Sequence, residues 1–383
     1  MHIERLHVVR IAHPWKTRVY VVLVTDTQVM GIGEATLGQL SRAVVGALRD
    51  IEASVIGLDP HDVELLRQRI LRDIYADGGQ VISAALAGIE MACWDIVARV
   101  AREPLFNVFG GRTQPRMRVY ANGWYRERLD AASIGRLARE VVAKGYTALK
   151  IDPFGASWRT ISREGLDRSM ELLAGVRSAI GPEADLIVEG HARFDAGTAC
   201  HVAQRLEPLH PLWFEEPVPY TDLQGYRRVA AQARVPIAAG ESLWRVSQFT
   251  ELLATGVSVV QFDPIHVGGL SAARTIAHLA LEHNTLIAPH SASGPVNELA
   301  CAHLATAYPH AVLLERFQDF EVEHDGDAAI RSSLKVADGM AELELVPGLG
   351  AGFALQELLA LHTEETRHDQ NVFRAEWEMR RSG

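Results

Sequence analysis

From residue 118 onward, eight short apolar runs alternate with longer amphipathic segments. The runs are nearly continuous in apolar residues, which is typical of parallel strands covered on both faces. Eight strands separated by helix-length segments close most simply into a (β/α) barrel. The predicted strands are residues 118–122, 148–152, 186–190, 212–216, 236–240, 257–263, 285–290 and 311–315.

The segments between these runs have the periodicity of helices. Residues 130–145 show it clearly, with Asp130 or Ser133 placed to cap the start of a helix and Gly145 placed to end it. The sequence therefore predicts a barrel over residues 118–320.

Polar side chains end several of the predicted strands. The carboxyl ends of barrel strands share one rim, where barrel enzymes carry their active sites. These side chains are therefore expected to face a common site. They follow one another at intervals of 26, 26, 22, 27 and 25 residues, in the order Glu189, Glu215, Glu241, Asp263, His290 and Glu315.

Residues 1–117 differ from the barrel in pattern and predict an α+β capping domain. Their first part suggests a three-stranded antiparallel sheet, with turns at Thr25–Gln28 and around Gly31. A long helix is predicted over residues 83–101.

The remaining residues, 321–383, are predicted to return to this capping domain. They contain a strand-like run at 340–346, a loop rich in Pro and Gly, and a polar tail. The fold class is thus expected to be α/β, a barrel with a cap built from the two ends of the chain.

Charge and cysteine content limit the possible partners and compartment. The formal net charge of −10 argues against nucleic acid and anionic membranes as partners. The first 16 residues are broken by charges, and the run at 19–24 is far too short to span a membrane. Cys93, Cys200 and Cys301 form no Cys-x-x-Cys pair. These features predict a cytoplasmic protein.

Three glutamates on successive strand ends predict a metal site. Clustered carboxylates repel one another and would take up protons unless a cation lay between them. Oxygen-only ligation by Glu189, Glu215 and Glu241 suits Mg²⁺ far better than Zn²⁺. The alternative is that each glutamate makes an ordinary salt bridge on the rim.

His290 and Asp263 end neighbouring strands and could form a proton-accepting pair. Asp263 would hold one imidazole nitrogen, so that the other could take a proton. A structural histidine beside a helix-capping Asp is the alternative. His191 lies two residues after Glu189 and therefore on the same face. It is predicted to take an active part rather than a merely hydrogen-bonded one.

Lys150 and Glu315 complete the predicted catalytic set. A buried Lys150 needs an anionic partner, either the glutamates or a carboxylate substrate. Glu315 could be a protonated donor, a hydrogen-bonding carboxylate or a member of a simple salt bridge. Three side chains of possible cap loops could cover the mouth, although ordinary surface roles are favoured for each of them: Trp15, Lys16 and Tyr75.

In these residues the chain resembles the enolase superfamily, and within it the mandelate racemase subgroup. The resemblance extends over nearly the whole length, and the order of the motifs is more specific than any one of them. They are GIGEA (31–35), ALAGIEMACWDIVAR (85–99), FEEP (214–217), AAGES (238–242), QFDPIHVGG (261–269), APHSASGP (288–295) and LLERF (313–317).

The resemblance implies a modified TIM barrel, (β/α)₇β, under an α+β cap. It implies Mg²⁺ on the three glutamates. It also implies that a His290–Asp263 pair removes the proton α to a metal-bound carboxylate, as in the wider superfamily. Glu315 would hydrogen-bond the opposite carboxylate oxygen. Homo-oligomers, dimers or octamers, are common among such proteins, and one is expected here.

One departure from the family pattern distinguishes between reactions. Racemases of this subgroup usually carry Lys-x-Lys on the second strand, whereas this chain has Lys150-Ile151-Asp152. The chain resembles the acid-sugar dehydratases in having His191 after the first ligand, where it would protonate the departing 3-hydroxyl. The first ligand is Glu189, where many relatives have Asp.

The predicted activity is therefore Mg²⁺-dependent dehydration of an aldonate or aldarate to a 2-keto-3-deoxy acid. Galactonate, gluconate and galactarate are examples of such small carboxylate substrates. A racemase or epimerase on the same scaffold is the first alternative, and a non-catalytic metal-binding barrel is the second. The predicted substrate contacts, at or just beyond strand ends, are Asn122, Trp124 and Arg193.

Overall fold

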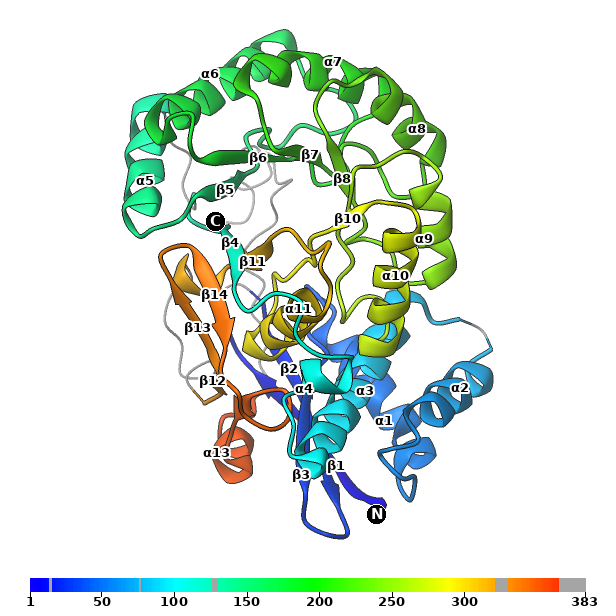
Figure 1. The fold of residues 1–383 in the computed structure, drawn as a ribbon. Helices are drawn as coiled ribbons and strands as arrows, with labels where there is room; N and C mark the ends of the chain where they lie inside the picture. The colour runs from blue at the N-terminus through cyan, green and yellow to red at the C-terminus, as the bar shows by residue number, and fades with distance from the viewer. Residues whose placement is uncertain (14–15, 76, 126–129, 321–328, 365–383) are drawn as a thin grey trace.

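The eight apolar runs form a parallel barrel (Figure 1) in the computed structural model, which describes residues 1–13, 16–75, 77–125, 130–320 and 329–364. Neighbouring strands pair in chain order from β4 to β10, and β11 pairs with β4. A parallel bridge between Ile287 and Ala311 closes the barrel. Each predicted run overlaps one strand, which confirms the barrel. The strands are β4 (Met117–Ala121), β5 (Ala148–Ile151), β6 (Asp185–Glu189), β7 (Trp213–Glu215), β8 (Ile237–Ala239), β9 (Val259–Val260), β10 (Leu286–Ile287) and β11 (Leu314–Arg316).

Helices lie between successive barrel strands, and α5 to α10 run around the outside of the strands in Figure 1. Several helices are capped by a residue of their own, whose side chain accepts the backbone N–H three residues later, as expected of Asp and Ser at this position. The caps are Asp130, Ser162, Asp195 and Asp222. The helices are α5 (Ala131–Ala143), α6 (Arg163–Ile180), α7 (Ala196–Leu206), α8 (Leu223–Gln232), α9 (Val246–Leu253), α10 (Leu270–Glu282) and α11 (Pro295–Ala307), with a short 3₁₀ turn η1 (Glu207–Leu209) after α7.

The N-terminal residues form an antiparallel sheet in the order β1-β2-β3, covered by helices. The turn predicted at Thr25–Gln28 is confirmed, but the turn predicted around Gly31 is wrong. Gly31 lies inside β3, and a Cβ there would come within 2.2 Å of the Ala92 carbonyl oxygen of α3. The glycine lets the helix approach the sheet. The elements are β1 (Ile3–Ile11), β2 (Arg18–Thr25), β3 (Met30–Glu34), α1 (Ser41–Val55), α2 (Val63–Asp73), α3 (Gly79–Ala101) and α4 (Leu105–Val108).

The C-terminal stretch contacts both the barrel and the cap. Strand β14 pairs antiparallel with β4 and so extends the barrel sheet, which the sequence did not predict. Farther along, the Gly348 carbonyl accepts the Leu105 amide at 2.9 Å, and the Thr363 amide donates to the Arg10 carbonyl at 2.9 Å. The elements are η2 (Gln318–Phe320), β12 (Arg331–Ser332), β13 (Leu334–Ala337), β14 (Met340–Leu343), β15 (Ala351–Gly352) and α13 (Leu355–Ala360).

Helix α3 is the central helix of the cap. Among the described residues it is the one helix that is long and apolar enough to cross a membrane, yet 72% of its most apolar window is buried inside the protein. It therefore has the character of a core helix.

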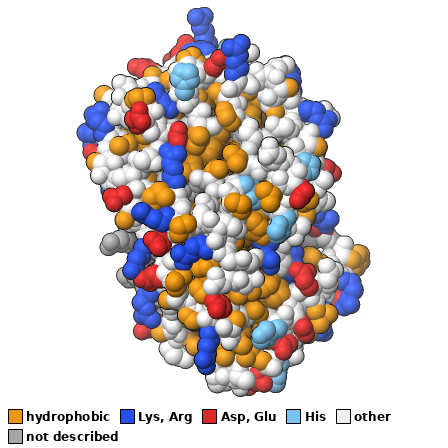
Figure 2. Space-filling view, in the orientation of Figure 1, with side chains coloured by type: hydrophobic (Ala, Val, Ile, Leu, Met, Phe, Trp, Pro, Cys, Tyr) orange, Lys and Arg blue, Asp and Glu red, His pale blue; other side chains and the backbone are white. Residues whose placement is uncertain are grey.

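On the face of the molecule shown in Figure 2, basic and acidic side chains are interspersed.

Candidate active site

The site lies directly above a layer of apolar side chains inside the barrel. Each strand region contributes one residue to this layer: Tyr120, Ala148, Ile187, Trp213, Ala238, Val259, Ala288 and Leu313. Side chains alternate between the two faces of a strand, so the second residue beyond a layer position also points inward. Those second residues include Asn122, Lys150, Glu189, Glu215, His290 and Glu315.

Three carboxylates converge at this level, as the sequence predicts. One oxygen from each of Glu189, Glu215 and Glu241 lies within 4.8 Å of the other two. Glu189 and Glu215 are fully buried and face each other in register across β6 and β7. Burial and the charge of Glu189 raise the pKa of Glu215 above its usual value. Separate salt bridges on the rim do not describe this arrangement.

The donor set of this glutamate trio fits a hard divalent cation. All the candidate ligand atoms are carboxylate oxygens, which is the preference of such ions. Glu189 Oε2 is buried and accepts no hydrogen bond among the described residues, and its contact there is an ion pair with Lys150 Nζ at 3.3 Å. Trp213 Nε1 donates to Glu215 Oε2 at 2.9 Å and orients that carboxylate. The three residues together could therefore hold a metal ion.

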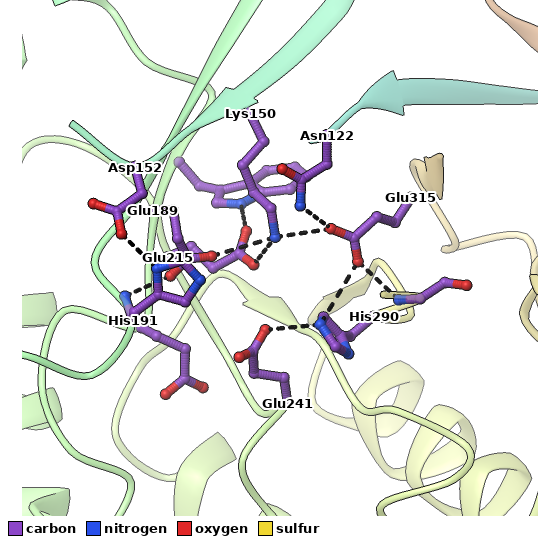
Figure 3. Close-up of polar contacts among 12 residues, drawn as sticks. Asn122, Lys150, Asp152, Glu189, His191, Glu215, Glu241, His290 and Glu315 are labelled. Atoms are coloured by element: carbon purple, nitrogen blue, oxygen red, sulfur yellow. Dashed lines mark hydrogen bonds and ion pairs between the residues drawn. The ribbon is translucent and has the colours of Figure 1, made fainter. Parts of the chain in front are cut away.

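Lys150 occupies the centre of the site and is 2% exposed. Its ammonium nitrogen lies 2.5 Å, 3.0 Å and 3.3 Å from carboxylate oxygens of Glu215, Glu315 and Glu189 (Figure 3). Burial alone would lower the pKa of Lys150, but these carboxylates raise it well above the usual value. Lys150 is therefore the cation that compensates the buried negative charge.

His290 and Asp263 form the predicted pair. His290 Nδ1 lies 2.7 Å from Asp263 Oδ2, and His290 Nε2 lies 3.2 Å from Glu241 Oε2. Burial alone would lower the pKa of His290, but Glu241, Glu315 and Asp263 raise it to about 10. The Nε2 atom thus faces the glutamate trio, while Asp263 holds the opposite edge of the ring.

A second histidine–carboxylate pair lies on the other side of Lys150 in Figure 3. His191 Nδ1 is 2.6 Å from Asp152 Oδ2. Burial alone would lower the pKa of His191, but Glu189 and Asp152 raise it to about 9. Asp152, the residue at which the chain departs from the Lys-x-Lys pattern, is therefore the partner of His191.

Glu315 is held as an ionised acceptor. Asn122 Nδ2 donates to its Oε1 at 2.8 Å, and the Ser291 amide donates to its Oε2 at 2.7 Å. Burial alone would raise the pKa of Glu315, but Lys150 and His290 lower it below the usual range. Of the alternatives left by the sequence, the hydrogen-bonding carboxylate fits these contacts better than the protonated donor.

The predicted substrate contacts all have protein partners. Arg193 is fully buried, and its guanidinium binds the Asp152 carboxylate and the Gly190 carbonyl. This burial argues against direct contact between Arg193 and a substrate, and the side chain instead supports Asp152. Trp124 Nε1 donates to the Lys150 carbonyl at 2.8 Å, and Asn122 holds Glu315.

The three residues predicted in cap loops differ in their surroundings. Lys16 Nζ donates to the Ala292 carbonyl at 2.8 Å, next to the segment that carries His290. The side chain of Tyr75 is 93% exposed. Trp15 lies outside the described residues.

His266 is a site residue that the sequence reasoning missed. Its Nδ1 lies 2.6 Å from the Glu241 carbonyl oxygen, and its ring centroid is 5.8 Å from that of His290. It also forms a second close group of possible ligands with Asp263 and His290. Its position three residues after Asp263 was the available signal.

Comparison with known families places both parts of the chain. Residues 5–110 match a model described as "Mandelate racemase / muconate lactonizing enzyme, N-terminal domain". Residues 133–357 match a model described as "Enolase C-terminal domain-like".

Individual relatives agree with these matches. The chain is 34% identical over 334 residues to D-gluconate dehydratase of Thermoproteus tenax, which covers 87% of this chain and 67% of the relative. It is 30% identical over 357 residues to D-galactonate dehydratase of Variovorax paradoxus, covering 91% of each chain. The crystal structure of a mandelate racemase/muconate lactonizing enzyme from Jannaschia sp. CCS1 superposes with a TM-score of 0.87 at 29% identity, covering 96% of this chain and 99% of that one.

Proposed function

Because the chain belongs to the mandelate racemase/muconate lactonizing enzyme family of the enolase superfamily, we propose that it dehydrates an acid sugar. The substrate is an aldonate such as gluconate or galactonate, or an aldarate, and the product is a 2-keto-3-deoxy acid. The two dehydratases reported above support the reaction class. The observation that carries the proposal is that His290 and His191, each paired with a carboxylate, lie on opposite sides of Lys150 in Figure 3. Three free, buried cysteines are in keeping with a cytoplasmic enzyme.

Mg²⁺ is the proposed ion of the glutamate trio, held by Glu189, Glu215 and Glu241. When bound, it would supply positive charge to the substrate carboxylate and stabilise the negative charge that develops there. Lys150 adds a second positive charge at the same place, and the ionised Glu315 holds the Lys150 ammonium at 3.0 Å.

The two histidines divide the proton transfers between them. A bound cation would offset the charge of Glu241, the carboxylate that raises the pKa of His290 most, and so favour the neutral imidazole. Nε2 of neutral His290 takes the proton from C2, while Asp263 holds Nδ1 and fixes the tautomer. The electron pair of the broken C–H bond forms the C2–C3 double bond, and the bond to the 3-hydroxyl breaks. His191 Nε2 gives its proton to the departing hydroxyl, which leaves as water. The resulting enol tautomerises to the 2-keto acid.

A panel of aldonates and aldarates tests this function directly. We expect 2-keto acid to form from at least one member in the presence of Mg²⁺, and EDTA to abolish the reaction until Mg²⁺ is restored. Formation of the keto acid is followed by semicarbazide absorbance and by NMR of the product. Absence of turnover on the whole panel with Mg²⁺-loaded protein would contradict the proposal.

Replacement of His191 by Asn separates the two proton transfers. We expect the dehydration kcat to fall by about 10²–10³-fold, which is the usual contribution of a general acid. Exchange of the C2 hydrogen in D₂O should continue, because His290 is untouched. His201→Asn, at an exposed histidine of α7, is the matched control. Equal loss of exchange and dehydration in H191N would remove His191 from the role of acid.

The His191–Asp152 pair also favours a second candidate function. Two imidazoles, each held at Nδ1 by a carboxylate, could exchange the C2 proton from opposite faces and so epimerise a 2-hydroxy acid. Incubation in D₂O distinguishes the reactions. Deuterium at an inverted C2 with all hydroxyls retained identifies an epimerase, and a keto acid identifies a dehydratase.

A further inference from the structure

Helices α10 and α11 of the barrel begin directly after a glycine, which has no side chain to cap the helix. Helix α10 is preceded by Gly269 and helix α11 by Gly294, and neither glycine can accept the free N–H groups of the first turn. This differs from α5, α6, α7 and α8, which carry their own Asp or Ser. The missing acceptors come from the cap.

Glu34 of β3 supplies the acceptor for α11. Its Oε1 accepts the Gly294 amide at 2.6 Å, and its Oε2 accepts the Asn297 amide at 2.9 Å. The Thr36 hydroxyl donates to Glu34 Oε1 at 2.7 Å and orients the carboxylate. Glu34 is fully buried. A residue of the GIGEA motif, more than 250 positions away, thus completes a barrel helix.

Glu90 of α3 does the same for α10. Its Oε2 accepts the Leu270 amide at 2.6 Å, and its Oε1 accepts the Ser271 amide at 2.7 Å. Glu90 is also fully buried. A Cβ at Gly269 would lie 2.2 Å from Glu90 Oε2, so glycine at this position leaves room for the carboxylate of the cap.

The two helices follow the strands that carry the base pair. Asp263 ends the β9 region and precedes α10, and His290 ends the β10 region and precedes α11. Asn297, whose amide binds Glu34, also places Nδ2 3.4 Å from Asp263 Oδ1. Asp263 is followed by α10, and His290 is followed by α11. The cap therefore holds the first turn of the helix that follows each member of the pair.

We propose that Glu34 and Glu90 are positioning residues that fix the two segments carrying the base pair by capping α10 and α11 from the other domain. Docking of the cap thereby sets the geometry of proton removal, in addition to covering the mouth of the barrel. The catalytic consequence rests on the function proposed above, whereas the structural one does not.

Glu34→Gln and Glu90→Gln test the proposal, because each keeps the size of the side chain but replaces one acceptor oxygen with an NH₂ donor. Asp95→Asn is the matched control. Asp95 is an equally buried carboxylate of α3 that accepts the Ile32 and Leu349 amides. It binds neither of the two helix starts. Thr36→Val, which removes the hydroxyl that orients Glu34, is a milder second variant if E34Q does not fold.

Hydrogen exchange measured by mass spectrometry gives a readout that needs no substrate. We expect faster exchange over residues 290–298 in E34Q and T36V, and over 264–272 in E90Q, with no change in either segment in D95N. We also expect kcat to fall about 10- to 100-fold in E34Q and E90Q, because the His290–Asp263 pair would be misplaced relative to the substrate. Binding of Mg²⁺ alone, measured by calorimetry, should change less than twofold.

Two outcomes would overturn the proposal. The first is unchanged local exchange in E34Q, T36V and E90Q. The second is faster exchange with kcat equal to that of the D95N control. If the wild-type protein dehydrates no acid sugar, the exchange experiment still decides whether the cap holds the two segments. Failure of the proposed function is then distinguished from failure of this inference.

Discussion

His290→Asn is expected to lower kcat by about 10³-fold, within the range that a general base usually contributes. Asn can keep a hydrogen bond to Asp263, but it cannot take the C2 proton. Exchange of the C2 hydrogen in D₂O should be lost together with dehydration, because both begin with that proton. Steady-state assays and NMR-detected exchange measure the two losses separately.

The matched control for His290→Asn is His303→Asn. His303 is a buried histidine of α11 that accepts the Phe106 amide at Nδ1 and contacts the Leu349 carbonyl through Nε2. Burial lowers its pKa to about 4, so it is neutral at physiological pH. The control should lose thermal stability while keeping kcat. Retention of C2 exchange in H290N would show that another group removes the proton.

Lys150→Met is expected to have the largest effect on stability. It leaves Glu189, Glu215 and Glu315 buried without the ammonium that lies among them. Removal of one partner from a buried ion pair typically costs about 3–5 kcal/mol. Urea denaturation in EDTA should show that loss in the free energy of unfolding. Lys144→Met, at an exposed lysine, should change it by no more than about 0.5 kcal/mol.

Addition of Mg²⁺ makes this experiment specific for the site. An ion that binds the folded protein stabilises it by mass action. In K150M the carboxylates of Glu189, Glu215 and Glu315 lack the Lys150 ammonium, so a bound cation should stabilise K150M more than it stabilises the wild type. The gap in unfolding free energy between K150M and the wild type should therefore narrow in Mg²⁺. If Mg²⁺ raises the unfolding free energy of neither protein, the carboxylates beside Lys150 do not take up the ion.

The barrel and most of the site could be predicted because they depend on local patterns. Apolar runs mark strands, and polar residues at the strand ends are placed on one rim by the parallel arrangement. The inward direction of Glu189, Glu215 and His290 follows from alternation along each strand. A reader of the sequence can count these positions without knowing any long-range contact.

The features that the sequence could not predict have the opposite cause, since each depends on contacts between distant segments. Gly31 was predicted in a turn because glycine often marks one, whereas here it admits α3 against the sheet. Arg193 lies near a strand end, and only the fold shows that Asp152 binds it in the interior. The pairing of β14 with β4, and the contacts of Glu34 and Glu90, likewise join parts of the chain that no local pattern relates.

The helix caps supplied by Glu34 and Glu90 can form only after the ribosome has made α10 and α11, long after it has made the two glutamates. Glu34 leaves the ribosome 260 residues before the Gly294 amide that it binds, and Glu90 leaves 180 residues before Leu270. The domain made first cannot bind both helix starts until residue Asn297 has been translated. Helices α5 to α8 carry their own caps and need no such delay. Nascent chains that stall before residue 270 should therefore be the ones that most need chaperone protection.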